Sequence, residues 1–172
     1  MRWEKILYHS SYNDYLSELA LLEKNRDFCH HNQEHFLDVA RLTYLFALES
    51  GYLISNWIDT KKNEKEPFYT RDIIYAISFL HDIGKGKQYI DGTPHEIVSA
   101  EIAVGILKDC DYDEEEIVFI TDAIRAHRKE VLQDEFYRML YRADKMSRKC
   151  FQCNVADRCN WKQELKNMRI RI

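Results

Sequence analysis

Six histidine and aspartate side chains of the sequence could together hold metal ions. Five helical segments carry them, and each side chain shares a helix face with apolar residues or stands where an apolar helix ends. A buried polar group without a partner costs on the order of 1–3 kcal/mol, so inward-facing groups must satisfy one another. A shared metal centre does this, and imidazole and carboxylate ligands suit Fe, Mn, Zn, Co or Ni. The six residues are His35, His81, Asp82, His95, His127 and Asp144.

A single histidine on an apolar helix face is more often a hydrogen-bonded core residue than a metal ligand. The adjacent pair His81 and Asp82 is less common, because it stands at a helix end directly before a glycine-containing turn. The remaining histidines have weaker claims. His9 lies in an unpatterned segment. His30 and His31 are expected at the exposed start of the next helix, where either could contact a metal ligand without binding the metal itself.

Three runs of sequence resemble the HD superfamily of metal-dependent phosphohydrolases. They are EHFLDVA at 34–40, LHDIGK at 80–85 and ADK at 143–145, and the resemblance covers about residues 28–148. It implies an all-α helical bundle in which His35, His81, Asp82 and Asp144 bind one metal. It also implies that Asp82 bridges to a second metal.

His95 and His127 match the two additional histidines of the binuclear branch of that superfamily. This branch includes symmetrical diadenosine tetraphosphatases and HD-GYP cyclic-dinucleotide phosphodiesterases, and the sequence lacks the GYP motif of the latter. The resemblance implies hydrolysis of a phosphomonoester, phosphodiester or phosphoanhydride bond of a nucleotide-like substrate. Two divalent ions would activate a water and neutralise phosphoryl charge, with Asp82 as the catalytic bridge. Fe or Mn is favoured, and Mg, Zn, Co or Ni would also suit the ligands.

Four cations near these residues are candidate substrate contacts. Lys85 is expected in the loop after His81, where it could act on the phosphate or the leaving group as a catalytic and binding residue. Arg128 follows His127, and Lys145 and Arg148 follow Asp144. The alternative is that all four are ordinary solvated cations.

Four of the five cysteines could form a second metal site. Cys150, Cys153 and Cys159 are closely spaced, and Cys29 or His30 could supply the fourth ligand and tie the C-terminal residues to the start of the domain. A structural zinc, an iron–sulfur cluster and no metal all remain open. Cys110 is expected to be a small buried residue.

The elements that carry these residues are predicted to be helical throughout. Helices are expected at about 13–24, 32–50, from after Thr70 to 81–82, from 93 or 94 to 108, at 113–127 and at 134–148, with an exposed loop at 59–67. The domain is expected to span 1–148, and residues 149–172 to form a short cysteine-containing extension packed on it.

The composition of the sequence limits the kinds of molecule that the protein is expected to bind. The formal net charge of -4 gives no general attraction to nucleic acid or to an anionic membrane. No apolar run approaches the roughly 20 residues of a membrane span. A cytoplasmic location is therefore expected, and the resemblance implies a small phosphorylated substrate as the partner. The sequence does not predict the oligomeric state.

Three other functions remain compatible with the sequence. The first is a mononuclear HD nucleotidase in which His95 and His127 contact phosphate. The second is a di-iron HD-type oxygenase that cleaves C–C or C–P bonds and consumes dioxygen. The third is a non-enzymatic sensor or scaffold, although six ionisable groups facing a core would be costly to keep without a metal.

Overall fold

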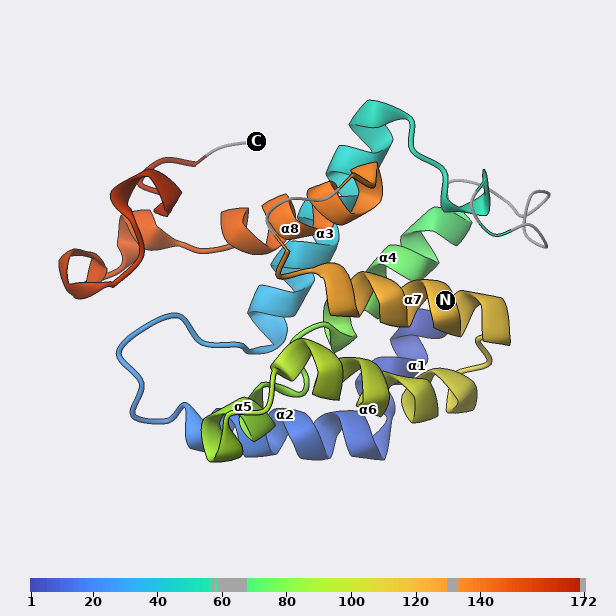
Figure 1. Cartoon of the computed structure of the whole chain (residues 1–172), viewed down its shortest axis with the longest axis horizontal. Coiled ribbons are helices and arrows are strands. Elements are labelled where there is room, and N and C mark those ends of the chain that lie inside the picture. The colour runs from blue at the N-terminus through green and yellow to red at the C-terminus, as the bar shows by residue number, and fades with distance from the viewer. Residues whose placement is uncertain (57, 59–67, 130–132, 171–172) are drawn as a thin grey trace.

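The structure, a computed structural model, describes residues 1–56, 58, 68–129 and 133–170, and no strand occurs among them (Figure 1). The chain begins with two helices, α1 (Arg2–Tyr8) and α2 (Ser10–Leu22). The sequence predicted the second at about 13–24 and missed the first. In the described part of the chain, no helix is both long enough and apolar enough to cross a membrane.

Helix α3 (Gln33–Ser50) lies close to its predicted range. The side chain of Asn32 caps its start by accepting a hydrogen bond from the His35 N–H at 3.0 Å. Gly51 ends it in the left-handed conformation, with φ of 68°, which glycine adopts without a steric penalty.

Helix α4 (Phe68–Leu80) is the central helix, because it is buried along nearly its whole length and packs against α1, α3 and α7. The predicted start after Thr70 is wrong. Thr70 lies within the helix, and its hydroxyl accepts a hydrogen bond from the Ile54 N–H at 2.9 Å instead of capping α4. The loop predicted at 59–67 lies outside the described residues.

Two helices follow the turn after α4. Residues 85–91, expected to be a loop, form the short helix α5 (Lys85–Asp91), so Lys85 is the first residue of a helix. Residues 91–94 form a turn, in which the Asp91 side chain accepts hydrogen bonds from the backbone and hydroxyl of Thr93. Helix α6 (His95–Asp109) then packs against α5 and α7.

The last two α-helices begin at capping aspartates. Asp113 accepts a hydrogen bond from the Glu116 N–H at the start of α7 (Glu114–Ala126), and Asp134 does the same for Tyr137 in α8 (Glu135–Met146). Helix α8 packs on α3, and α7 packs on α4 and α6. Both helices lie within two residues of their predicted bounds.

Residues 149–170 contain three short 3-10 turns and no α-helix. The turns are η3 (Cys150–Gln152), η4 (Ala156–Arg158) and η5 (Gln163–Leu165). The Asn167 amide donates to the carbonyl oxygens of Lys145 and Arg148 at the end of α8. This extension (red in Figure 1) therefore stays attached to α8.

Candidate metal centre

The turn between α4 and α5 presents Asp82 to the centre of the helical bundle. His81 is fully buried and Asp82 is 4% exposed. The Gly84 N–H donates to the Ser99 hydroxyl of α6 at 2.9 Å, which fixes the turn against that helix. A side chain at position 84 would stand 2.6 Å from the Ser99 nitrogen, so only glycine fits this approach.

One group of possible metal ligands forms on the Oδ2 side of Asp82. His81 Nε2 lies 3.4 Å from this oxygen and His35 Nε2 lies 3.7 Å from it. His35 Nε2 also lies 3.6 Å from Asp144 Oδ1. The four residues come from α3, the end of α4 and α8, and their ligand atoms all lie within 4.8 Å of one another.

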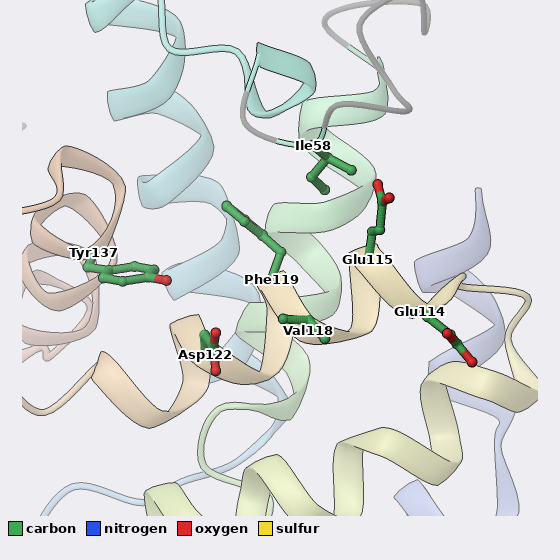
Figure 2. A pocket seen from close by; sticks show the side chains of 7 residues that line it. All are labelled: Ile58, Glu114, Glu115, Val118, Phe119, Asp122 and Tyr137. Atoms are coloured by element: carbon green, nitrogen blue, oxygen red, sulfur yellow. The ribbon is translucent and has the colours of Figure 1, made fainter.

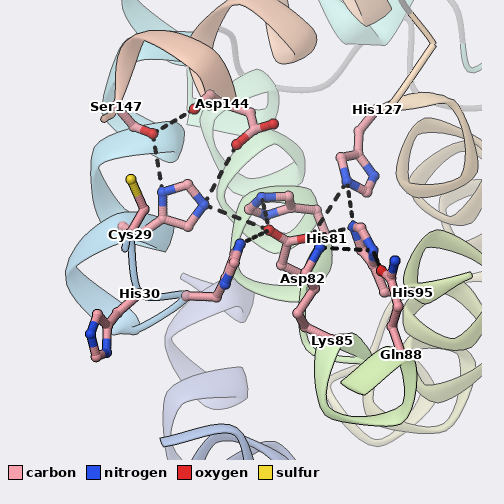
Figure 3. A network of polar contacts seen from close by, with 12 residues as sticks. Cys29, His30, His81, Asp82, Lys85, Gln88, His95, His127, Asp144 and Ser147 are labelled. Atoms are coloured by element: carbon pink, nitrogen blue, oxygen red, sulfur yellow. Dashed lines mark hydrogen bonds and ion pairs between the residues drawn. The ribbon is translucent and has the colours of Figure 1, made fainter. Parts of the chain in front are cut away.

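A second group forms on the Oδ1 side of the same carboxylate. His95 Nε2 lies 2.7 Å from Asp82 Oδ1, and His127 Nε2 lies 3.5 Å from it. The two Nε2 atoms are 3.3 Å apart. Figure 3 shows Asp82 between the two groups, so this single carboxylate belongs to both.

The histidine rings are oriented by their other nitrogen. Each Nδ1 faces an oxygen, and a carbonyl oxygen can only accept, so Nδ1 carries the hydrogen and Nε2 keeps its lone pair. This arrangement is typical of metal-binding histidines. The partners are Ser78 O for His81 (2.7 Å), Ile124 O for His127 (2.6 Å), the Ser147 hydroxyl for His35 (3.0 Å) and the Gln88 side-chain oxygen for His95.

Several of these buried atoms are better placed to bind a metal ion than to hydrogen-bond to one another. Among the described residues, His35 Nε2, His81 Nε2 and Asp82 Oδ1 find no hydrogen-bond partner, although all three are buried. Unsatisfied atoms of this kind are costly, and a cation that accepts their lone pairs removes the cost. Two His and Asp groups of the structure could therefore hold metal ions.

The carboxylates of the site are held in their charged form. Burial raises the pKa of Asp82, but the histidines around the carboxylate, first His81 and then His127 and His35, outweigh burial and set the pKa well below its usual value. The pKa of Asp144 is also lowered, because the charge of Lys145 overcomes burial. Charged carboxylates are the form that binds cations.

His31 precedes α3 as expected, and it takes the supporting position that the sequence analysis allowed for it, although it is partly buried where an exposed position was expected. Its Nε2 lies 3.7 Å from Asp82 Oδ2, and its Nδ1 lies 2.5 Å from Glu23 Oε1. Tyr89 donates a second hydrogen bond to Glu23 at 2.7 Å. The pair of adjacent histidines was the only signal for this role in the sequence. His30 lines the same cavity but contacts Arg26 O and belongs to neither group of possible metal ligands. His9 lies elsewhere and contacts Asp109.

The four predicted cations line the same cavity as the proposed metal ligands. This cavity of about 240 Å³ is lined by both histidine groups, by His31 and by two aromatic rings, Tyr141 and Trp161. The predicted cations in its lining are Lys85, Arg128, Lys145 and Arg148.

Two of these cations are partly withdrawn from water. Burial lowers the pKa of Lys85, whose Nζ lies 3.2 Å from His95 Nδ1. Arg148 stacks 3.6 Å above the Trp161 ring, and its Nη1 is buried without a hydrogen-bond partner among the described residues. A buried, unpaired guanidinium nitrogen is well suited to an anionic ligand.

A larger cavity lies elsewhere and has the wrong charge for phosphate. Its volume is about 460 Å³, and Figure 2 shows its lining around α7. The lining contains three carboxylates and no histidine or cation. It consists of Ile58, Glu114, Glu115, Val118, Phe119, Asp122 and Tyr137. Negative side chains repel a phosphorylated substrate, so the smaller cavity is the candidate active site.

The five cysteines carry no disulfide. Cys29 lines the cavity of the metal centre and stands next to the polar network in Figure 3. Cys150, Cys153 and Cys159 are partly buried in the extension, and Cys110 is buried in the core as predicted.

Comparisons with known proteins agree with this geometry. The HD domain matches residues 32–161 of the chain. An uncharacterized protein of Clostridium beijerinckii (strain ATCC 51743 / NCIMB 8052) is 43% identical over 169 residues, which is 98% of each chain. No solved structure matches the chain. Since the HD domain match spans most of the chain and both ligand groups, the chain belongs to the HD domain family, a superfamily of metal-dependent phosphohydrolases.

Proposed function

We propose that this protein is a binuclear metal-dependent phosphohydrolase that acts on a small, nucleotide-like phosphorylated substrate. The observation that carries the proposal is the position of Asp82, whose two carboxylate oxygens face two separate groups of ligands. A carboxylate shared in this way is what a two-metal centre requires.

Each metal has a defined set of proposed ligands. His35, His81, Asp82 and Asp144 would hold the first ion, and Asp82 with His95 and His127 would hold the second. When bound, the pair of ions would supply an activated water at neutral pH and would neutralise phosphoryl oxygens. The mixed imidazole and carboxylate set favours Fe or Mn, and it accepts Mg, Zn, Co or Ni.

The chain's own cations would orient the substrate. Lys85 and Arg148 carry buried charge toward the cavity, where each could pair with a non-bridging phosphate oxygen. Arg128 and Lys145 already contact Glu96 and Asp144, so we assign them a weaker contribution. The rings of Tyr141 and Trp161 line the same cavity and could stack on a base, which supports a nucleotide-like substrate.

Metal analysis followed by an activity screen tests the proposal. Purified protein loaded with Mn²⁺ or Fe²⁺ should contain about two ions per chain in the His/Asp centre and should hydrolyse members of a phosphomonoester, phosphodiester and nucleotide-anhydride panel. One ion per chain with activity would indicate a mononuclear nucleotidase. Dioxygen uptake by the iron-loaded protein would indicate an oxygenase, and full loading without turnover on the whole panel would contradict the proposed function.

A further inference from the structure

The C-terminal extension has almost no apolar core of its own. Between residues 149 and 170, the only buried side chains are Lys166 and Asn167. The large apolar residues of this segment, such as Phe151 and Ile170, are exposed. A short segment that buries so little apolar surface usually needs a covalent or metal cross-link to hold one conformation.

Three cysteines occur at successive turns of this extension. Cys150 begins η3, and its carbonyl accepts a hydrogen bond from the Cys153 N–H at 3.1 Å. The Cys153 carbonyl in turn accepts from Ala156, which begins η4, and Cys159 ends that turn. The backbone therefore folds back on itself twice within the ten residues that carry these thiols.

The fourth cysteine comes from the other end of the chain. Cys29 lies in the loop before α3, and an ion pair of 3.1 Å between Asp27 and Arg158 joins this loop to η4. Cys29 and Cys153 line one cavity of about 290 Å³ between the loop and the extension. Partial burial raises the pKa of the Cys29 thiol, and the other three thiols act in the same direction, so each of them lies within electrostatic reach of Cys29.

The distances between the sulfur atoms distinguish a site for a single ion from a site for an iron–sulfur cluster. Four thiolates around one Zn²⁺ lie about 3.8 Å apart, because each Zn–S bond is about 2.3 Å and the geometry is tetrahedral. No three of these four described thiols have sulfurs within 4.8 Å of one another. An iron–sulfur cluster holds its cysteines farther apart than a single ion does, since several metal atoms stand between them.

We propose that Cys29, Cys150, Cys153 and Cys159 bind an iron–sulfur cluster, separate from the His/Asp centre. The cluster cross-links the extension to the loop before α3. The extension also carries Trp161, which stacks on Arg148 at the cavity of the His/Asp centre. The cluster therefore holds part of the substrate cavity in place.

Acid-labile sulfide is the decisive measurement, because the His/Asp centre can hold iron but cannot hold sulfide. Full-length protein is purified without oxygen and, if needed, treated with Fe²⁺ and sulfide. We expect acid-labile sulfide, about two per chain for a [2Fe–2S] cluster or about four for a [4Fe–4S] cluster, and a broad visible absorption band that bleaches on reduction. Cys153→Ser should lose both signals.

Three further variants make the test specific. Cys29→Ser should also lose the sulfide, and this exposed residue lies outside the extension, so its replacement does not alter the extension's own sequence. Cys110→Ala removes the remaining cysteine and should keep the sulfide, and Asp82→Asn should lose the His/Asp metals and keep it. Stoichiometric zinc without sulfide, or protein free of both, overturns the proposal. Sulfide that persists in both Cys29→Ser and Cys153→Ser overturns it equally.

Discussion

At the residue scale, the site depends on one carboxylate that serves two groups of histidines. Asp82 is nearly completely buried, and each of its oxygens faces Nε2 atoms that have their lone pairs free. A side chain shared in this way couples the two metal positions. Losing it should therefore affect both positions at once, whereas losing His95 or His127 should affect one.

Asp82→Asn should abolish binding at both metal positions. The amide keeps the shape of the carboxylate but lacks the charge that a shared ligand supplies, so we expect turnover to fall roughly 10³-fold or more. Metal content per chain and kcat on the best substrate of the panel are the measurements. Asp91→Asn is the control, because this partly exposed carboxylate pairs with Lys87 and should leave both values unchanged. Normal metal content in Asp82→Asn would refute the shared-ligand role.

Glu23 should stabilise the fold in a pH-dependent way. Burial raises its pKa, but hydrogen bonds from His31 and Tyr89 and the charge of His31 lower the pKa to about 2 in the folded protein. A depressed folded-state pKa adds stability that is fully present above the unfolded value of 4.5 and is lost as the pH falls toward about 2. At about 1.4 kcal/mol per pKa unit, the contribution near neutral pH is at most roughly 3 kcal/mol.

The free energy of unfolding of wild type and Glu23→Gln, measured in denaturant from pH 7 to pH 3.5, tests this contribution. The difference between the two proteins should be largest near neutral pH and should shrink below about pH 4.5. Glu18→Gln on the exposed face of α2 should show no such trend. A difference that stays constant over this pH range would contradict the assigned pKa.

At the element scale, the sequence predicted the long helices better than the short ones. Helix α6 lies within two residues of its predicted range, although no side chain caps its start. Helices α3, α7 and α8 lie close to their predicted ranges, because Asn32, Asp113 and Asp134 cap their starts with side-chain hydrogen bonds. Helices α1 and α5 were missed. Each has only seven residues and depends on packing against neighbouring helices, which local sequence does not encode.

The candidate site was predictable to a similar extent. The six His and Asp side chains could be found because they interrupt apolar helix faces or stand at a helix end, and the structure brings all six together. His30 and His31 could both be named as supporting residues, but the sequence could not choose between them, because the fold of the loop before α3 brings only His31 close to Asp82. Lys85 was assigned to a loop because two nearby glycines suggested one, whereas Gly84 serves to let the turn approach α6.

Gly84→Ala should separate the turn from α6. The new methyl group would meet the Ser99 nitrogen at 2.6 Å and the Val98 side chain at 2.9 Å, and a helix backbone cannot yield at little cost. We expect a loss of roughly 1–3 kcal/mol in unfolding free energy and weaker binding of the metal held by His95, which lies on α6. Chemical denaturation and metal titration measure the two effects.

Gly105→Ala provides the matched control, because it makes the same change within α6 where nothing lies within 4 Å of the added methyl group. In a helix interior, alanine is favoured over glycine by up to about 1 kcal/mol, so this variant should be as stable as wild type or more stable. Equal behaviour of the two variants would show that the turn does not depend on the close approach.

At the scale of the whole molecule, one arginine joins the start of the chain to its centre. Arg2 of α1 bonds Asp72 of α4 at 2.8 Å and Glu116 of α7 at 2.7 and 2.9 Å. Both carboxylates are buried, and Tyr69 adds a hydrogen bond to Glu116. The guanidinium therefore neutralises two carboxylates of the bundle core, and α1 becomes part of the same cooperative unit.

Arg2→Met should destabilise the whole bundle by about 3 kcal/mol, because it removes the guanidinium that pairs with the buried carboxylates of Asp72 and Glu116. The free energy of unfolding at pH 7 is the measurement, and a single transition is expected since α1 contacts the central helix α4 directly. Lys5→Met is the control: its ion pair with Asp111 is exposed, and such pairs contribute about 0–1 kcal/mol. Equal losses of unfolding free energy in the two variants would mean that the ion pairs of Arg2 contribute no more than an exposed ion pair. A larger loss in Arg2→Met would instead show that the buried carboxylates of α4 and α7 need the first turn of the chain to remain in place. These are the two helices that end directly before His81 and His127.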